Sequence, residues 1–263
     1  MKAVVGRLGT VSSGQTLADQ RKFFEPPDVV QVRGGTQFSS VPNYDLVTIA
    51  SGDRANPLGR NVQDRFFAFR DAVIGHMRDG DVASGDDPDG IADNFTSLQA
   101  ALDSPLTVGD LFDVTDIVEP AEGADLAHLQ SGKGYYLDLV EPGEKGLSSP
   151  VTIEGILLFT TYLPEQVVDV ATCSLIEGSG LLYAINVLDG SAAINWDELP
   201  DSDPLAYARR TYALGSGIPS SVVPIFHPDG VEGMVGSSGG ASFPPLGLGL
   251  PRSRTFWFEE TGL

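Results

Sequence analysis

Short apolar runs separated by turn residues recur along this chain and predict β-strands rather than long helices. The first group begins with an apolar run after Pro26 and Pro27, and continues with DLVTIASGD from Asp45 and DRFFAFRD from Asp64. Val, Ile, Phe and Tyr dominate these runs, and Gly, Pro, Asn and Asp bound them, as is typical of strands. The pattern predicts a strand, a turn, a second strand, a loop and a third strand.

The same order returns twice further along the chain. The second copy contains VTIEGILLFTTY and GLLYAINVLDG, and a weaker third copy contains SVVPIF, VEGMVGSSGG and RTFWFEE. One such unit cannot bury both faces of its small sheet, so units of this kind must stack side by side. We therefore predict an all-β fold, a partial β-propeller with blade-like units at about 23–71, 150–197 and 217–260. A β-sandwich also has short strands, but the ordered recurrence favours the propeller.

Residues 72–134 interrupt this pattern and predict an insertion between two blades. From Asp79 to Asp125 the chain is rich in Asp and Glu and has no Lys or Arg. Asp93 or Asn94 is a candidate cap for a helix over 96–102, and TVGDLFDVTDIV also has helical spacing. We therefore expect an acidic, partly helical insertion that folds over the surface.

The net charge of −20 over 263 residues argues against nucleic-acid binding, which needs clustered Lys and Arg. Solubility, a salty habitat and divalent-cation binding are all compatible with this acidity. No apolar run reaches the roughly 18 residues of a transmembrane helix, and residues 1–10 do not have the pattern of a signal peptide. The single cysteine, Cys173, excludes an internal disulfide framework and a cysteine-rich zinc site.

Calcium is the one candidate cofactor, and GDDPDGIAD at 85–93 is the nearest match to a calcium loop. Calcium prefers several oxygen ligands at alternating positions, with Gly at the sharp turn. Asp87, Asp89 and Asp93 stand at suitable positions, whereas Gly85 occupies the place of the first acidic ligand. The alternative is a solvated acidic turn.

Three further motifs have structural explanations. GSSGG formally fits the nucleophile elbow around Ser238, but the residues that follow cannot form the required helix. The sequence around Lys133 lacks the leading Gly and the following Ser or Thr of a phosphate loop. Asp53 and Asp64 are a candidate acid–base pair, for which a turn bond or a structural ion pair is the default.

Several strings, taken together and in order, resemble the C-terminal propeller of the bacterial PilC/PilY-type pilus biogenesis factors. The stretch from Tyr183 to Trp196 also resembles the blade motif of quinoprotein-type propellers, in which a Trp packs between blades. The strings that carry the pilus-factor resemblance are FFEPPDVV (23–30), IASGDRANPLGRNVQDRFFAFRD (49–71), LTVGDLFDVTD (106–116) and GYYLDLVEPGEKGLSSPVTIEGILLFTTYLP (134–164).

This resemblance implies a propeller larger than this chain completes, in a protein at the cell surface, at the pilus tip or associated with the outer membrane. It also implies a non-enzymatic role in type IV pilus assembly, extension or adhesion, with pilin subunits, other pilus machinery or a host ligand as partners. Two alternatives stay open. A quinoprotein-like dehydrogenase needs a complete propeller and usually two adjacent cysteines, and a generic propeller scaffold cannot be separated by fold alone.

Overall fold

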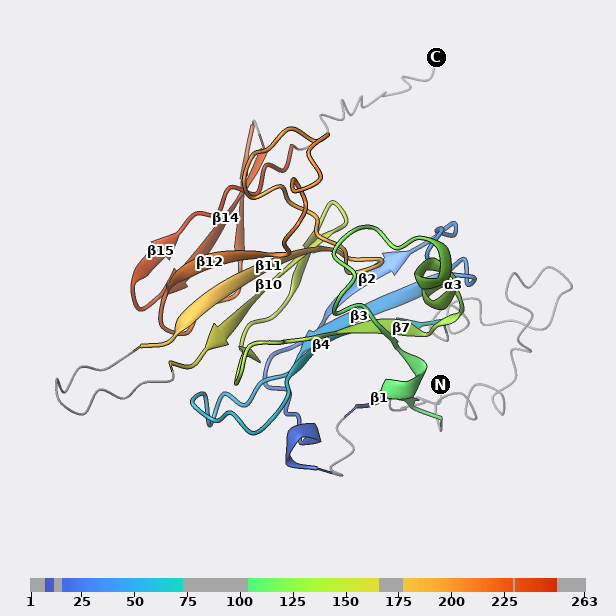
Figure 1. The fold of residues 1–263 in the computed structure, drawn as a ribbon, viewed down its shortest axis with the longest axis horizontal. Coiled ribbons are helices and arrows are strands. Elements are labelled where there is room, and N and C mark those ends of the chain that lie inside the picture. Colours follow the sequence, from blue (N-terminus) through green and yellow to red (C-terminus); the bar gives the residue numbers. More distant parts are fainter. Residues whose placement is uncertain (1–7, 12–15, 73–103, 166–176, 229, 250–263) are drawn as a thin grey trace, which may run out of the picture.

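Strands dominate the structure, and they form mainly antiparallel sheets that pack face to face (Figure 1). The structure is a computed structural model, and it describes residues 8–11, 16–72, 104–165, 177–228 and 230–249. The all-β prediction agrees with this architecture. Among the described residues no sheet closes on itself.

The first sheet contains the three strand runs of the first predicted group and is buried on both faces. In β4, Phe66 and Phe67 are both fully buried although they point to opposite faces of the sheet. This explains why the run FFAF is apolar at every position rather than at alternate positions. The strands, in spatial order, are β2 (Asp28–Val32), β3 (Tyr44–Ala50), β4 (Arg65–Asp71), β7 (Gly134–Asp138) and β6 (Phe112–Asp113).

The second sheet is built on one long hairpin-like pair. Strands β10 and β11 stay in register from Ile156 opposite Asn186 to Leu163 opposite Ser179. The turn before β10 is Glu154-Gly155, and both residues have positive φ (51° and 83°), as a tight two-residue hairpin requires. The strands are β8 (Lys145–Gly146), β9 (Val151–Ile153), β10 (Ile156–Leu163), β11 (Ser179–Asn186) and β12 (Thr211–Ser216).

A third, smaller sheet and a separate parallel pair of short strands complete the described fold. The parallel pair covers the outer face of the first sheet. Val11 and Leu111, beside that pair, are buried against Phe67 and Phe69. The third sheet comprises β13 (Val223–His227), β14 (Gly230–Ser237) and β15 (Gly240–Ser242). The parallel pair is β1 (Gly9–Thr10) with β5 (Leu106–Thr107), and the short helices are η1 (Leu17–Asp19), η2 (Val108–Asp110) and α3 (Gly123–Ser131).

Alternating side chains of β10 connect all three sheets. Phe159 stacks on Phe66 of the first sheet, with ring centroids 4.4 Å apart, and on Tyr183 of β11 at 4.7 Å. The neighbouring Leu158 points the other way, into a cluster that includes Val235 of the third sheet and Trp196. Trp196 is thus buried between neighbouring sheets, as its place in the sequence motif suggested.

Residues 72–134 differ from the sequence prediction in two respects. We expected them between two blade-like units, but β4 pairs directly with β7, so the segment leaves and re-enters the same sheet. We also expected helical structure over TVGDLFDVTDIV, and this stretch instead forms β5, η2 and β6. The helix that does form, α3, begins at Gly123, and the candidate helix over 96–102 lies outside the described residues.

Tertiary packing overrides the helical spacing of that stretch. Val114 is fully buried and Leu111 is 7% exposed, because their side chains enter two different apolar clusters. A helix would place residues three apart on one face, which cannot serve both clusters. Deleting Asp79 to Asp125 would therefore remove buried residues of both clusters.

Candidate functional site

Two glycines bring two distant segments together at one end of the first sheet. The backbone N–H of Gly146 donates to the carbonyl of Ser51 at 2.9 Å. A Cβ on Gly146 would lie 2.2 Å from the Cβ of Ala50, and a Cβ on Gly52 would lie 2.4 Å from the carbonyl oxygen of Gly146. Only glycine allows this approach, so the SGD and GEKG strings meet in space.

Asp64 is the buried acid of this junction and is 1% exposed. Ser51 Oγ donates to Asp64 Oδ1 at 2.7 Å and accepts from the backbone N–H of Arg65 at 2.9 Å. The second carboxylate oxygen, Oδ2, accepts no hydrogen bond and lies 4.0 Å from Lys145 Nζ. Burial raises the pKa of Asp64 and lowers the pKa of Lys145, since the low-dielectric surroundings disfavour both charges.

The adjacent residues Glu144 and Lys145 point in opposite directions and join two sheets. Lys145 Nζ donates to the carbonyl of Gly143 at 3.2 Å and to that of Gly59, in the loop between β3 and β4. Glu144 Oε1 accepts from Thr161 Oγ1 at 2.6 Å and from the Tyr183 hydroxyl at 2.9 Å in the second sheet. Burial raises the pKa of Glu144, and these two hydrogen bonds oppose the shift.

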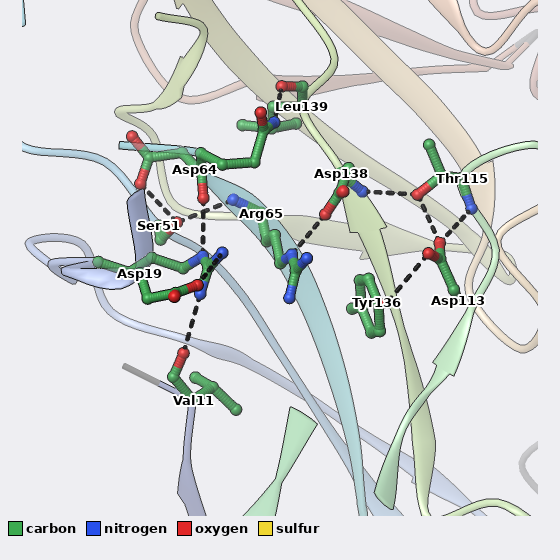
Figure 2. Close-up of polar contacts among 12 residues, drawn as sticks. Val11, Asp19, Ser51, Asp64, Arg65, Asp113, Thr115, Tyr136, Asp138 and Leu139 are labelled. Carbon is green, nitrogen blue, oxygen red and sulfur yellow. Dashed lines mark hydrogen bonds and ion pairs between the residues drawn. The ribbon is translucent and has the colours of Figure 1, made fainter. Parts of the chain in front are cut away.

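Figure 2 shows how the polar network continues along the strand ends of the first sheet. Arg65 Nε pairs with Asp138, and the Tyr136 hydroxyl donates to Asp113 Oδ2 at 2.9 Å. Thr115 joins both sides, because its hydroxyl donates to Asp113 and accepts from the backbone N–H of Asp138 at 2.9 Å. These contacts fix the backbone beside the junction.

A pocket of about 180 Å³ opens beside Asp64 and Lys145. Its charged side chains are two ammonium groups and two carboxylates, so its formal charge is zero. Amide side chains and two apolar side chains complete the wall. The lining residues are Leu17, Gln20, Lys22, Asp53, Asn56, Gly59, Asn61, Val62, Asp64 and Lys145.

The structure brings the predicted pair Asp53 and Asp64 to the same pocket. Asp53 makes the expected structural contacts: its carboxylate accepts from the backbone N–H of Ala55 at 3.1 Å and pairs with Lys22 at 2.7 Å. Its chain neighbour Arg54 pairs instead with Glu25. These contacts support a turn and an ion pair at Asp53 rather than acid–base chemistry.

The remaining predicted sites have different outcomes. The calcium candidates Asp87, Asp89 and Asp93 lie outside the described residues, as does Cys173, so calcium binding there stays a prediction. Within the described ranges no three His, Cys, Asp or Glu side chains gather closely enough to hold a metal ion. Ser238 lies in the turn between β14 and β15 and contacts Glu177 Oε2 at 2.5 Å, which is not the strand–turn–helix setting of a nucleophile elbow.

Sequence reasoning singled out Asp64 but missed two other buried charges of this junction and one elsewhere in the fold. Glu144 and Lys145 were noted only as part of the resemblance string, and Arg210 was not noted at all. Arg210 is 7% exposed and donates to the carbonyls of Val114, Thr115, Ile117 and Gly190. The charged pair inside GEKG, between two apolar strands, was the available signal.

The fold and junction define a mostly β chain whose mainly antiparallel sheets pack face to face and are joined by buried polar contacts. The chain is similar in structure to the C-terminal domain of PilY1 from Pseudomonas aeruginosa, with a TM-score of 0.50 and 13% sequence identity. The match covers 89% of this chain and 46% of that domain, so the chain spans less than half of it. No family model matches the chain, and a comparison with curated proteins finds no match.

At 13% sequence identity, the structural similarity to this domain is evidence about the fold alone. Among the helices that the structure describes, none combines the length and apolar character needed to cross a bilayer.

Proposed function

We propose that this chain forms part of a β-propeller and acts by protein–protein recognition in type IV pilus assembly, extension or surface adhesion. The observation that carries the proposal is the structural match to the PilY1 C-terminal domain over most of this chain. The ordered strings that resemble the PilC/PilY-type factors support it independently, because they rest on residue identities rather than on backbone shape. In this proposal the face-packed sheets are blades, and further blades complete the ring.

The proposed role is recognition without catalysis. Its partners are pilin subunits, other pilus machinery or a host-surface ligand, and its place is the cell surface, the pilus tip or the outer membrane. The buried Asp64 and Glu144 fit this role, because hydroxyl donors and a lysine hold them inside the fold. Calcium bound by Asp87, Asp89 and Asp93 is part of the same proposal.

An acidic face that leads into α3 is the favoured contact surface. Asp116, Glu119, Glu122 and Asp125 line one open surface hollow, and all four are exposed. With a net charge of −20, the chain would attract a basic partner surface over long range. We therefore expect the partner contact to weaken with added salt.

A gene-deletion strain tests the role directly, with sheared surface pili and twitching motility as the measurements. We expect loss of pili or motility, restored by the intact gene but restored poorly by a gene carrying Glu119→Gln and Glu122→Gln. The matched control, Glu198→Gln with Asp201→Asn, removes the same charge from the loop between β11 and β12 and should restore fully. Normal pili and motility in the deletion strain would overturn the role in pilus assembly and extension and leave adhesion or the generic scaffold.

A further inference from the structure

The pocket at the end of the first sheet contains an unsatisfied buried acid. Asp64 is 1% exposed and lines the pocket, yet its Oδ2 accepts no hydrogen bond. Buried polar atoms are normally paired, and an unpaired one indicates a missing ligand or water. Lys145 also lines the pocket, and its Nζ, 4.0 Å from Oδ2, is too far away for a direct hydrogen bond.

A hydroxyl group placed between Asp64 Oδ2 and Lys145 Nζ can form a hydrogen bond with each of them. A hydroxyl donates one hydrogen bond and accepts others, so it can donate to Asp64 Oδ2 while it accepts from Lys145 Nζ. A metal cation cannot accept from an ammonium group, and an ionised anion cannot donate to a carboxylate. The zero formal charge of Lys22, Lys145, Asp53 and Asp64 together likewise favours a neutral ligand over either kind of ion.

The rest of the wall suits a ring that carries several hydroxyls. Asn56 and Asn61 add side chains that both donate and accept hydrogen bonds, and Gln20 adds a third amide. Leu17, which is 65% exposed, and Val62 offer an apolar surface for C–H groups. The volume of about 180 Å³ is below the roughly 300–1,000 Å³ of drug-sized pockets, so the room suits one ring.

We propose that this pocket binds one neutral, hydroxyl-rich ring, such as a single sugar residue, with a hydroxyl bridging Asp64 and Lys145. The inference concerns the pocket alone and goes beyond the pilus-related role, on which it does not depend. The ring has two possible sources: a free sugar in solution, or the terminal residue of a glycan.

Saturation-transfer NMR and calorimetric titration of the full chain test the proposal. The probes are glucose, galactose, mannose and N-acetylglucosamine, each free and as its methyl glycoside, with glycine and calcium chloride as charged comparisons. Binding of the methyl glycosides indicates a glycan end, because a glycan sugar is substituted at the same oxygen. Binding of the free sugars alone indicates a soluble ligand.

The variant Asn56→Ala with Asn61→Ala locates the binding. Both residues are exposed, so the fold should persist, and we expect sugar affinity about tenfold weaker, as for the loss of one or two hydrogen bonds. Gln31→Ala removes an exposed amide from β2, outside the pocket, and should leave affinity unchanged. The proposal is wrong if no sugar binds saturably, if only glycine or calcium binds, or if the double variant binds sugar like the parent.

Discussion

The ring of Phe66 stacks on the ring of Phe159 across the boundary between the first and second sheets, with an interplanar angle of 16°. Both side chains are fully buried, and Phe159 also stacks on Tyr183. Offset stacking adds stability beyond the burial of apolar area. This three-ring stack is the centre of the contact between the two sheets.

Replacing Phe159 with alanine should lower the free energy of unfolding by about 3–5 kcal/mol, because it leaves a cavity between two sheets. Urea unfolding followed by fluorescence and circular dichroism measures the change. The control is Phe226→Ala, since Phe226 is 61% exposed and should change stability by no more than about 0.5 kcal/mol. Equal effects of the two variants would contradict the proposed packing.

Gly146→Ala should destabilise the chain by about 1–3 kcal/mol or more, because its new Cβ collides with Ala50 across the junction. Ala50→Gly removes the atom that it meets, so the double variant should be less destabilised than the sum of the single variants. Gly249→Ala is the control, as no atom lies within 4 Å of its Cβ position. Additive effects in the double-mutant cycle would show that the two positions do not touch.

Arg210→Met should lower the free energy of unfolding by about 3 kcal/mol or more, because it leaves buried carbonyl groups without a hydrogen-bond donor. Three of the Arg210 hydrogen bonds, to Val114, Thr115 and Gly190, measure 2.6–2.8 Å. Backbone amide hydrogen exchange should become faster first around residues 114–117 and residue 190. Its chain neighbour supplies the control: Arg209 pairs with Asp197 at the surface, so Arg209→Met should cost no more than about 1 kcal/mol.

Glu144→Gln should change how stability depends on pH. Because burial raises the pKa of Glu144, the folded chain holds this proton more tightly than the unfolded chain does. Raising the pH above the ordinary value of 4.5 therefore costs folding free energy until folded Glu144 also ionises. The glutamine has no such proton, so the variant should gain stability relative to the parent as the pH rises.

Urea unfolding of both proteins at a series of pH values measures this difference. Replacing the carboxyl group by an amide changes the free energy of unfolding by the same amount at every pH. The loss of the titrating proton instead changes how that free energy varies with pH. A parallel curve for Glu144→Gln would mean that Glu144 does not resist ionisation in the folded chain.

The sequence by itself determined most of the strands and their turns. Period-two and continuous apolar runs predicted β3, β4, β10 and β11, because strand propensity and burial act on neighbouring residues. The turn at Glu154-Gly155 follows from the same local rules, since glycine tolerates positive φ. The placement of Trp196 between sheets also came from a motif within one short stretch.

Only the tertiary structure decided which distant segments meet. Nothing local shows that β4 pairs with β7 across residues 72–134, or that Lys145 reaches Asp64 while Glu144 reaches Tyr183. The helical spacing over 107–118 did not produce a long helix, because two apolar clusters need its side chains in different directions. Local propensity contributes tenths of a kcal/mol per residue, whereas burial of a large side chain contributes about 1.5–3 kcal/mol, so the packing decided both the pairing and the pocket.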